Sequence, residues 1–139
     1  MRVEESVEIA RSIEDVWAFV ADPLNDPRWC RKVKSVDPSG ARRWTVLHQP
    51  VPLRPAVELV LEHIEEQAPT RLTMREDDAA SIFHVEYQLG SSGTGTKFTQ
   101  TSSIEWRTLP GLLHGVFNRG VRRDVRAQLR TLKRVLEAT

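Results

Sequence analysis

The sequence has a single cysteine and no long apolar run, and each scarcity excludes a class of protein. Cys30 has no second cysteine with which to form an internal disulfide, and the opening residues Met1–Glu5 lack the apolar core of a signal peptide. We therefore expect a reducing, cytoplasmic location. No stretch approaches the roughly 18 consecutive apolar residues that a membrane-spanning helix needs, so no transmembrane segment is expected.

The chain also has almost no net charge, because 20 basic residues face 19 acidic ones. A field this weak does not favour nucleic acid or a membrane surface as a partner. The four histidines are scattered along the chain without the spacing of a metal site: His48, His63, His84 and His114. The glycine-rich stretch Gly90–Gly95 joins two strands and opens no helix, so it is not a phosphate-binding loop. We expect neither a metal ion nor a cofactor.

The first third of the chain predicts one strand followed by two short helices. Alternating apolar residues from Val3 to Ile9 are typical of a half-buried strand. Ser12 is placed to cap a helix that Pro23 ends, and a short second helical turn closes near Trp29. Six more strands are then expected, at Val33–Asp37, Arg42–Gln49, Ala56–Glu65, Arg71–Glu76, Ser81–Leu89 and Thr96–Arg107.

The residues from Gly111 to Thr139 predict one long helix with a narrow apolar stripe. The stripe consists of Val121, Val125, Leu129, Leu132 and Leu136. It must be buried against the sheet, and short connections favour antiparallel pairing. We therefore expect an α+β fold, one domain spanning 1–139, in which a seven-stranded curved antiparallel sheet wraps around the C-terminal helix. Because one helix cannot fill a broad concave sheet, a pocket should remain between them.

Several residues near the N-terminus carry a resemblance to a known family. The opening strand, Ser12–Trp17, Ala21–Pro23, Pro27 and Trp29 resemble the start of the polyketide cyclase/dehydrase-like branch of the START-related helix-grip superfamily (SRPBCC). The resemblance follows the element order of the whole chain, and its motifs are structural. It implies the helix-grip fold of START domains and the birch pollen allergen, with Trp29 at the lip of a cup that holds a hydrophobic or amphipathic small molecule.

Strand alternation and the helical stripe together nominate residues that line this pocket. The expected ligand-binding residues are Trp29, Trp44, Phe83, Tyr87, Gln100, Ser102, His114, Phe117 and Val121. Tyr87, Gln100 and Ser102 are polar groups on an apolar face, and they either orient a ligand or satisfy one another. His114 points inward if the helix is regular through Gly115; otherwise Phe117 and its neighbours become the anchors.

Three functions are compatible with these patterns. The leading one is binding of a lipid or an aromatic polyketide-like molecule. The second is a cyclase or dehydratase in which Tyr87 or His114 moves a proton. The other candidates for a general base, His48 and His63, are interpreted instead as solvated residues at strand ends. The third is an interaction module that docks through the basic flank of the helix, which consists of Arg119, Arg122, Arg123, Arg126, Arg130, Lys133 and Arg134. A homodimer is left open.

Overall fold

The computed structural model describes residues 1–139 and contains the elements that the sequence predicts, in the same order. Strand β1 (Arg2–Ile9) precedes helix α1 (Ile13–Val20), the 3-10 turn η1 (Pro23–Asn25) and helix α2 (Asp26–Trp29). Six strands follow: β2 (Val33–Gly40), β3 (Arg43–His48), β4 (Val57–Gln67), β5 (Arg71–Asp77), β6 (Ser81–Ser92) and β7 (Gly95–Trp106). The 3-10 turn η2 (Gly111–Leu113) leads into α3 (His114–Glu137), so the predicted α+β fold is confirmed.

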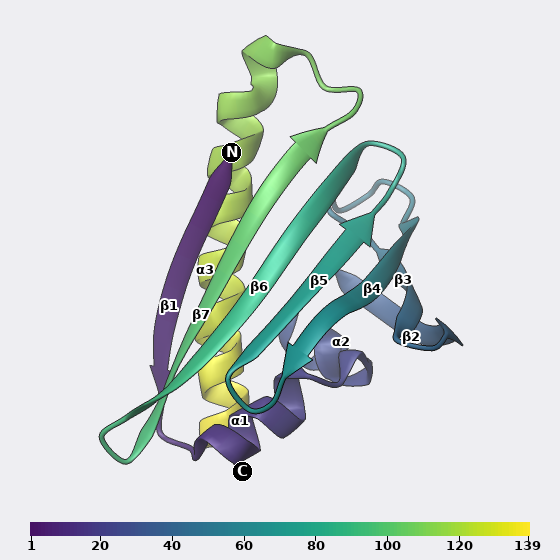
Figure 1. The fold of residues 1–139 in the computed structure, drawn as a ribbon. Helices are drawn as coiled ribbons and strands as arrows, with labels where there is room; N and C mark the ends of the chain where they lie inside the picture. Colours follow the sequence, from purple (N-terminus) through teal and green to yellow (C-terminus); the bar gives the residue numbers. More distant parts are fainter.

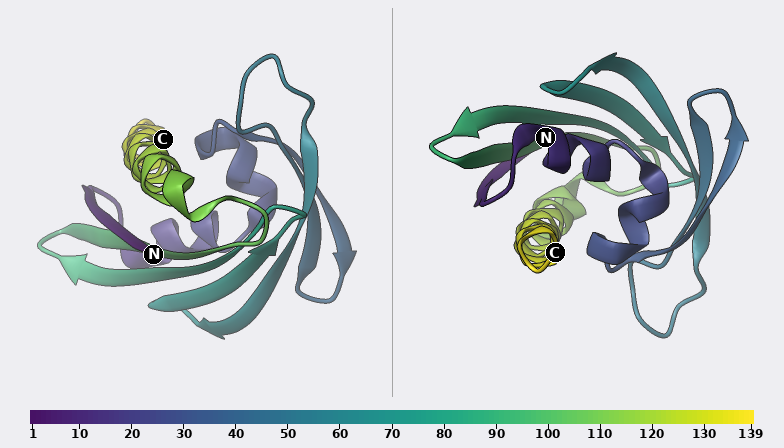
Figure 2. Two further views of the ribbon diagram at one scale, coloured as in Figure 1. Left: turned by 90° about the horizontal axis from the view of Figure 1, so that it is seen from above. Right: turned by 90° about the horizontal axis from the view of Figure 1, so that it is seen from below.

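All seven strands form one antiparallel sheet in the order β1-β7-β6-β5-β4-β3-β2. The strands after β1 form a meander, and β1 pairs with β7, the last strand. Figure 1 shows α3 running along one side of the sheet, with its C-terminal end beside α1. The end views in Figure 2 show that the sheet curls around α3. Inside the bend, α1 lies against β6 and β7, while α2 lies between α3 and β2.

Local interactions explain where the first helix begins and why β7 can start next to β1. The Ser12 hydroxyl accepts a hydrogen bond of 3.2 Å from the backbone N–H of Asp15, which confirms the predicted cap. Gly95 lies so close to β1 that a Cβ atom there would be 2.3 Å from the carbonyl oxygen of Ile9. Only glycine permits this approach.

The apolar stripe of α3 forms the centre of the core. Val125, Leu129, Leu132 and Leu136 are each at most 5% exposed, while Val121 is half-buried. Beside the stripe, the Arg126 guanidinium lies 2.7 Å from the Glu5 carboxylate, and Lys133 Nζ donates to the Glu8 carbonyl at 2.8 Å. These contacts hold α3 to β1, so part of the basic flank has a structural role. The flank's remaining cations are exposed to solvent.

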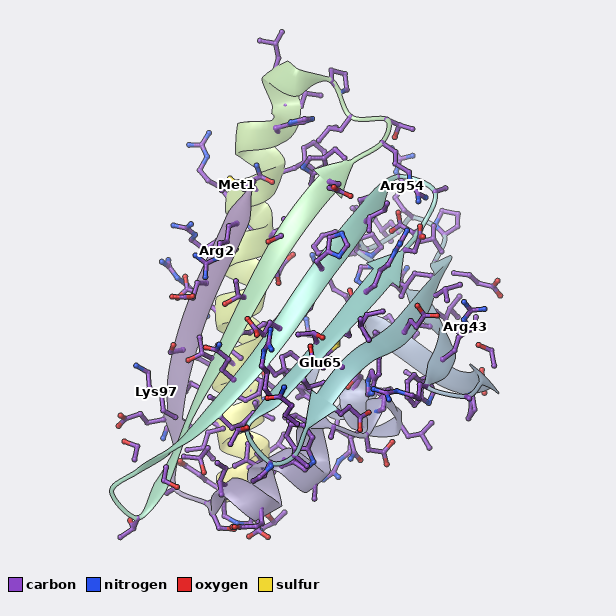
Figure 3. The ribbon with its side chains drawn as sticks, viewed as in Figure 1. Met1, Arg2, Arg43, Arg54, Glu65 and Lys97 are labelled. Atoms are coloured by element: carbon purple, nitrogen blue, oxygen red, sulfur yellow. The ribbon has the colours of Figure 1, made fainter.

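The face of the sheet turned away from α3 is covered with charged side chains. Figure 3 labels Arg2, Arg43, Glu65 and Lys97 among them. Many of these charges are paired, for example Arg43 with Glu62 at 2.9 Å. Two open hollows on this outer surface are lined mainly by such polar and charged groups, which are poorly suited to an apolar ligand. Among the helices, none has the length and hydropathy of a bilayer-crossing segment.

Candidate functional site

The concave surface of the sheet, which we call the inner face, carries rows of side chains from neighbouring strands. Strand register places Glu76 of β5 between Leu61 of β4 and Phe83 of β6, and Phe83 in turn pairs with Ile104 of β7. Directly paired residues in antiparallel strands project to the same side of the sheet. Glu76 is therefore a carboxylic acid in a row of apolar inner-face residues.

The inner face is packed at one end and open to solvent at the other. Near α1 and the C-terminal half of α3, Leu72, Leu89 and Phe98 are buried. Toward the N-terminal half of α3, Phe83 and Val121 point inward and yet remain half-exposed. Both pack against the edge of the core and leave part of their apolar surface uncovered. The structure therefore supports a site at the N-terminal half of α3.

Two carboxylic acids, Asp26 of α2 and Glu76 of β5, lie at this site, and we call them the acid pair. Burial raises the pKa of Glu76 from 4.5 to about 7, and the negative charge of Asp78 contributes to the rise. Burial also raises the pKa of Asp26 well above its ordinary value, with a further contribution from the charge of Glu76. Both side chains nevertheless retain part of their accessible surface. Each acid is therefore largely surrounded by protein and still reached by solvent.

Tyr87 and Cys30 lie in the same neighbourhood as the acid pair. Burial raises the pKa of Tyr87 well above its ordinary value, and the charges of Asp26, Cys30 and Glu76 add to this effect. Burial likewise raises the pKa of the Cys30 thiol, with smaller contributions from Asp26 and Glu76. Near neutral pH both groups therefore remain protonated. Cys30 is accordingly a buried neutral thiol and not an activated nucleophile.

Two buried polar atoms in this region have no hydrogen-bond partner. The first is Nε1 of Trp29, a residue that is 1% exposed; this indole N–H faces Asp26 and lowers its pKa, but the two do not reach hydrogen-bond geometry. The second is Oε1 of Gln100, a residue that is 7% exposed. Because unsatisfied buried polar atoms are rare in folded proteins, their presence together favours a polar binding site.

The structure brings four of the expected ligand-binding residues together: Trp29, Tyr87, Gln100 and Ser102. The rings of Trp29 and Tyr87 lie 6.0 Å apart, and Tyr87 is the register partner of Gln100. Gln100 Nε2 lies 3.5 Å from the Ser102 hydroxyl oxygen, at the long limit of a hydrogen bond. Gln100 and Ser102 thus partly satisfy one another, as the alternative interpretation expected, but Gln100 Oε1 remains free.

Other expected residues gather around Trp106 at the open end of the inner face. The Trp106 ring centre lies 6.3 Å from those of Phe83 and His114 and 5.8 Å from that of Phe117. Trp106 Nε1 also donates a hydrogen bond of 3.3 Å to the side-chain oxygen of Asn118. Phe117 is 47% exposed, so it lies at the rim of this group and not inside it.

The histidines differ from the sequence interpretation. His63 is only 4% exposed, packs its ring 4.5 Å from that of Trp44 and places Nδ1 2.8 Å from a Glu66 oxygen, so the prediction of a solvated histidine was wrong for this residue. Trp44, an expected ligand-binding residue on β3, therefore packs against His63 and is not among the rings gathered around Trp29 or Trp106. His48 is half-exposed, and burial, followed by the charge of Lys32, lowers its pKa. His114 Nε2 lies 2.9 Å from the carbonyl oxygen of Leu109, so this ring nitrogen is engaged by the backbone.

The sequence analysis did not identify the acid pair. For Glu76 a signal existed, because Leu72, Met74 and Glu76 alternate along β5 and the first two are plainly core residues. For Asp26 no comparable signal existed. It stands beside Pro27 in a stretch typical of a turn, and its burial depends on how α2 packs inside the bend of the sheet.

The sequence also matches a family model over residues 1–137. That family is described as polyketide cyclase / dehydrase and lipid transport. The chain belongs to this family. The match confirms the resemblance to the SRPBCC superfamily and to its cyclase/dehydrase-like branch. Among curated protein sequences, none matches the chain.

Solved structures with the same fold span nearly the whole chain. A protein from Thermus thermophilus has a TM-score of 0.82 at 20% identity, covering 99% of this chain and 98% of that one. The Zhui aromatase/cyclase from Streptomyces sp. R1128 has a TM-score of 0.81 at 14% identity, with coverages of 99% and 93%. A START superfamily protein from Mycobacterium smegmatis has a TM-score of 0.74 at 14% identity, with coverages of 99% and 94%. At these identities the similarity shows the fold alone.

Proposed function

We propose that the protein binds a hydrophobic or amphipathic small molecule, a lipid or an aromatic polyketide-like compound, between the inner face and α3. One observation carries this proposal: Phe83 and Val121 face the interior from opposite walls but are only half-buried. Mainly apolar walls with a few polar groups are typical of small-molecule sites. The family description, which includes lipid transport, supports the same function. The buried neutral thiol of Cys30 is compatible with a cytoplasmic location.

A neutral fluorescent probe, N-phenyl-1-naphthylamine, tests this proposal. Its fluorescence should increase and saturate on titration with the protein, because the probe enters an apolar environment. Val121→Trp places an indole in the interior and should weaken probe binding by about tenfold or more through overlap with the probe. Ala127→Trp, on the exposed side of the same helix, is the matched control and should bind as the wild type does. Equal binding by both variants would place the site elsewhere.

Tyr87→Phe tests whether a polar group orients the ligand. Loss of the hydroxyl should weaken binding of 1-naphthalenemethanol by about 0.5–1.5 kcal/mol, the net value of one hydrogen bond. Binding of N-phenyl-1-naphthylamine, which has no hydroxyl group, should change little. Both dissociation constants are measured by fluorescence titration of wild type and variant. Equal losses for the two probes would show that Tyr87 acts only through packing against Trp29 and Phe98.

A cyclase or dehydratase is the second candidate function, and Glu76 is the observation that favours it. General acids and bases work best when their pKa lies near the working pH, and the pKa of Glu76 is about 7. The raised pKa of Tyr87 and the engaged His114 make these two residues poorer proton carriers than Glu76. If a poly-β-ketone thioester is cyclised, product formation should depend on pH near 7 and be abolished in Glu76→Gln. Retention of turnover by that variant would exclude Glu76 as the proton carrier.

A further inference from the structure

The acid pair has no counter-ion within the chain. Neither Asp26 nor Glu76 forms an ion pair or a side-chain hydrogen bond. No cation contributes to the pKa of either acid, and Lys32, which lies near His48, is paired with Asp124. A buried acid without a partner is costly when it is ionised. A positively charged group brought by a ligand removes that cost.

The titratable groups next to Glu76 are acidic or neutral, and the cation of this region, Lys32, is paired with Asp124. They are Asp26 and Cys30 from α2 and its C-terminal cap, Tyr87 from β6, Asp78 from the turn after β5 and, farther along the same end, His48 with the paired Lys32 and Asp124. An anionic ligand group would be repelled here, whereas a cation would be attracted. Among ligands of equal hydrophobicity, the site should therefore bind cations more tightly than anions.

Gln100 and Trp29 provide evidence for a ligand that is independent of the acids. Gln100 Oε1 is an unpaired acceptor on a residue that is 7% exposed, and its register partner Tyr87 packs against Trp29. The unpaired indole N–H of Trp29 faces Asp26 and favours its ionised form. A ligand group that carries several N–H donors satisfies the acceptors without competing with Trp29.

We propose that the acid pair binds the protonated nitrogen of a hydrophobic amine, whose apolar body lies along the inner face toward Phe83 and Trp106. This inference rests on the proposed binding function and names the class of ligand. Carboxylate-bearing amphiphiles, such as fatty acids, are poor ligands on the same argument. The charge-assisted hydrogen bonds of the amine provide the selectivity.

Three naphthalene probes of nearly equal size test the inference: the cation 1-naphthylmethylamine, the neutral alcohol 1-naphthalenemethanol and the anion of 1-naphthaleneacetic acid, which we call the acetate. At about pH 8 the amine should bind about tenfold more tightly than the alcohol, and the acetate should bind most weakly. Affinity for the amine should fall as the pH is lowered through about 7, because Glu76 then takes up a proton and loses its charge. Affinity for the alcohol should not follow this dependence.

Glu76→Gln keeps the shape of the side chain and removes its charge. In this variant binding of the amine should weaken by about tenfold, while binding of the alcohol should change less than about twofold. Asp26→Asn is the second variant and should act in the same direction. Glu62→Gln is the matched control on the outer face, where its partner is Arg43, and it should bind all three probes as the wild type does.

The possible outcomes distinguish this inference from the function on which it rests. If amine and alcohol bind equally to the wild type, or if Glu76→Gln weakens both equally, amine recognition is overturned while the binding function stands. Tightest binding by the acetate would also overturn it. If none of the probes binds, including N-phenyl-1-naphthylamine, the binding function itself is overturned.

Discussion

Replacing Leu129 with alanine is expected to lower the free energy of unfolding by about 2–5 kcal/mol. Leu129 is 2% exposed and lies in the stripe of α3 with Val125, Leu132 and Leu136, all of which belong to the main core cluster. The substitution removes apolar contacts and leaves a cavity that the sheet and α3 close only in part. Urea denaturation of wild type and variant, followed by circular dichroism, measures the loss.

Arg130→Ala is the matched control for this prediction. Arg130 is the next residue of α3 but is exposed to solvent. Its replacement should change the free energy of unfolding by less than about 0.5 kcal/mol, as is usual for surface substitutions. A loss of similar size in both variants would mean that the stripe does not seal the core.

Replacing Glu76 with glutamine is expected to stabilise the protein at alkaline pH and to have little effect at acidic pH. Burial raises the pKa of Glu76 from 4.5 to about 7 in the folded protein. At about pH 8 the folded wild type therefore carries a buried charge that the unfolded chain exposes to water. Glutamine removes that charge, so the variant should be more stable by about 3 kcal/mol, since the pKa rises from 4.5 to about 7 and each pKa unit corresponds to about 1.4 kcal/mol.

The sign of the pH dependence follows from proton binding. Between pH 4.5 and about 7 the folded state holds a proton on Glu76 that the unfolded state has released. Stability falls with rising pH wherever the folded state binds more protons. The wild type should thus lose stability through this window and then level off. The raised pKa of Asp26 acts in the same direction, so Asp26→Asn should also reduce the pH dependence.

Urea denaturation of wild type and Glu76→Gln across this pH range provides the measurement. Comparison at each pH cancels the titration of groups that the two proteins share. Glu62→Gln on the outer face serves as the control, and its pairing with Arg43 at the surface should make a difference of less than about 1 kcal/mol at any pH. A constant difference between Glu76→Gln and wild type from acid to alkaline pH would contradict a raised pKa for Glu76.

Much of the fold could be predicted because its signals are local. Alternation marked the strands, the hydroxyl of Ser12 marked the start of α1, and the spacing of the stripe marked α3. The element ends were less accurate; for example, β2 continues to Gly40 and β6 continues to Ser92. Strand ends depend on pairing with the neighbouring strand, and this pairing is not a property of either segment alone.

The candidate site was predicted only in part. Alternation placed Tyr87, Gln100 and Ser102 on the inner face, where the structure has them. His63 was misinterpreted because its position near the end of a strand suggested solvent exposure, whereas its ring packs against Trp44 and its Nδ1 meets Glu66. Side-chain burial at a strand end is decided by neighbouring segments, which the local pattern does not describe.

By itself the sequence determined the helices and strands, their antiparallel order and the apolar stripe on which the sheet closes. These features follow from side-chain periodicity and capping, which act over a few residues. Only the tertiary structure brought Asp26 of α2 and Glu76 of β5 together and decided which inner-face residues remain open to solvent. The pKa of a carboxylic acid depends on the atoms that replace water around it. For Glu76 those atoms come from α2, β4 and β6, segments whose contact exists only in the folded protein.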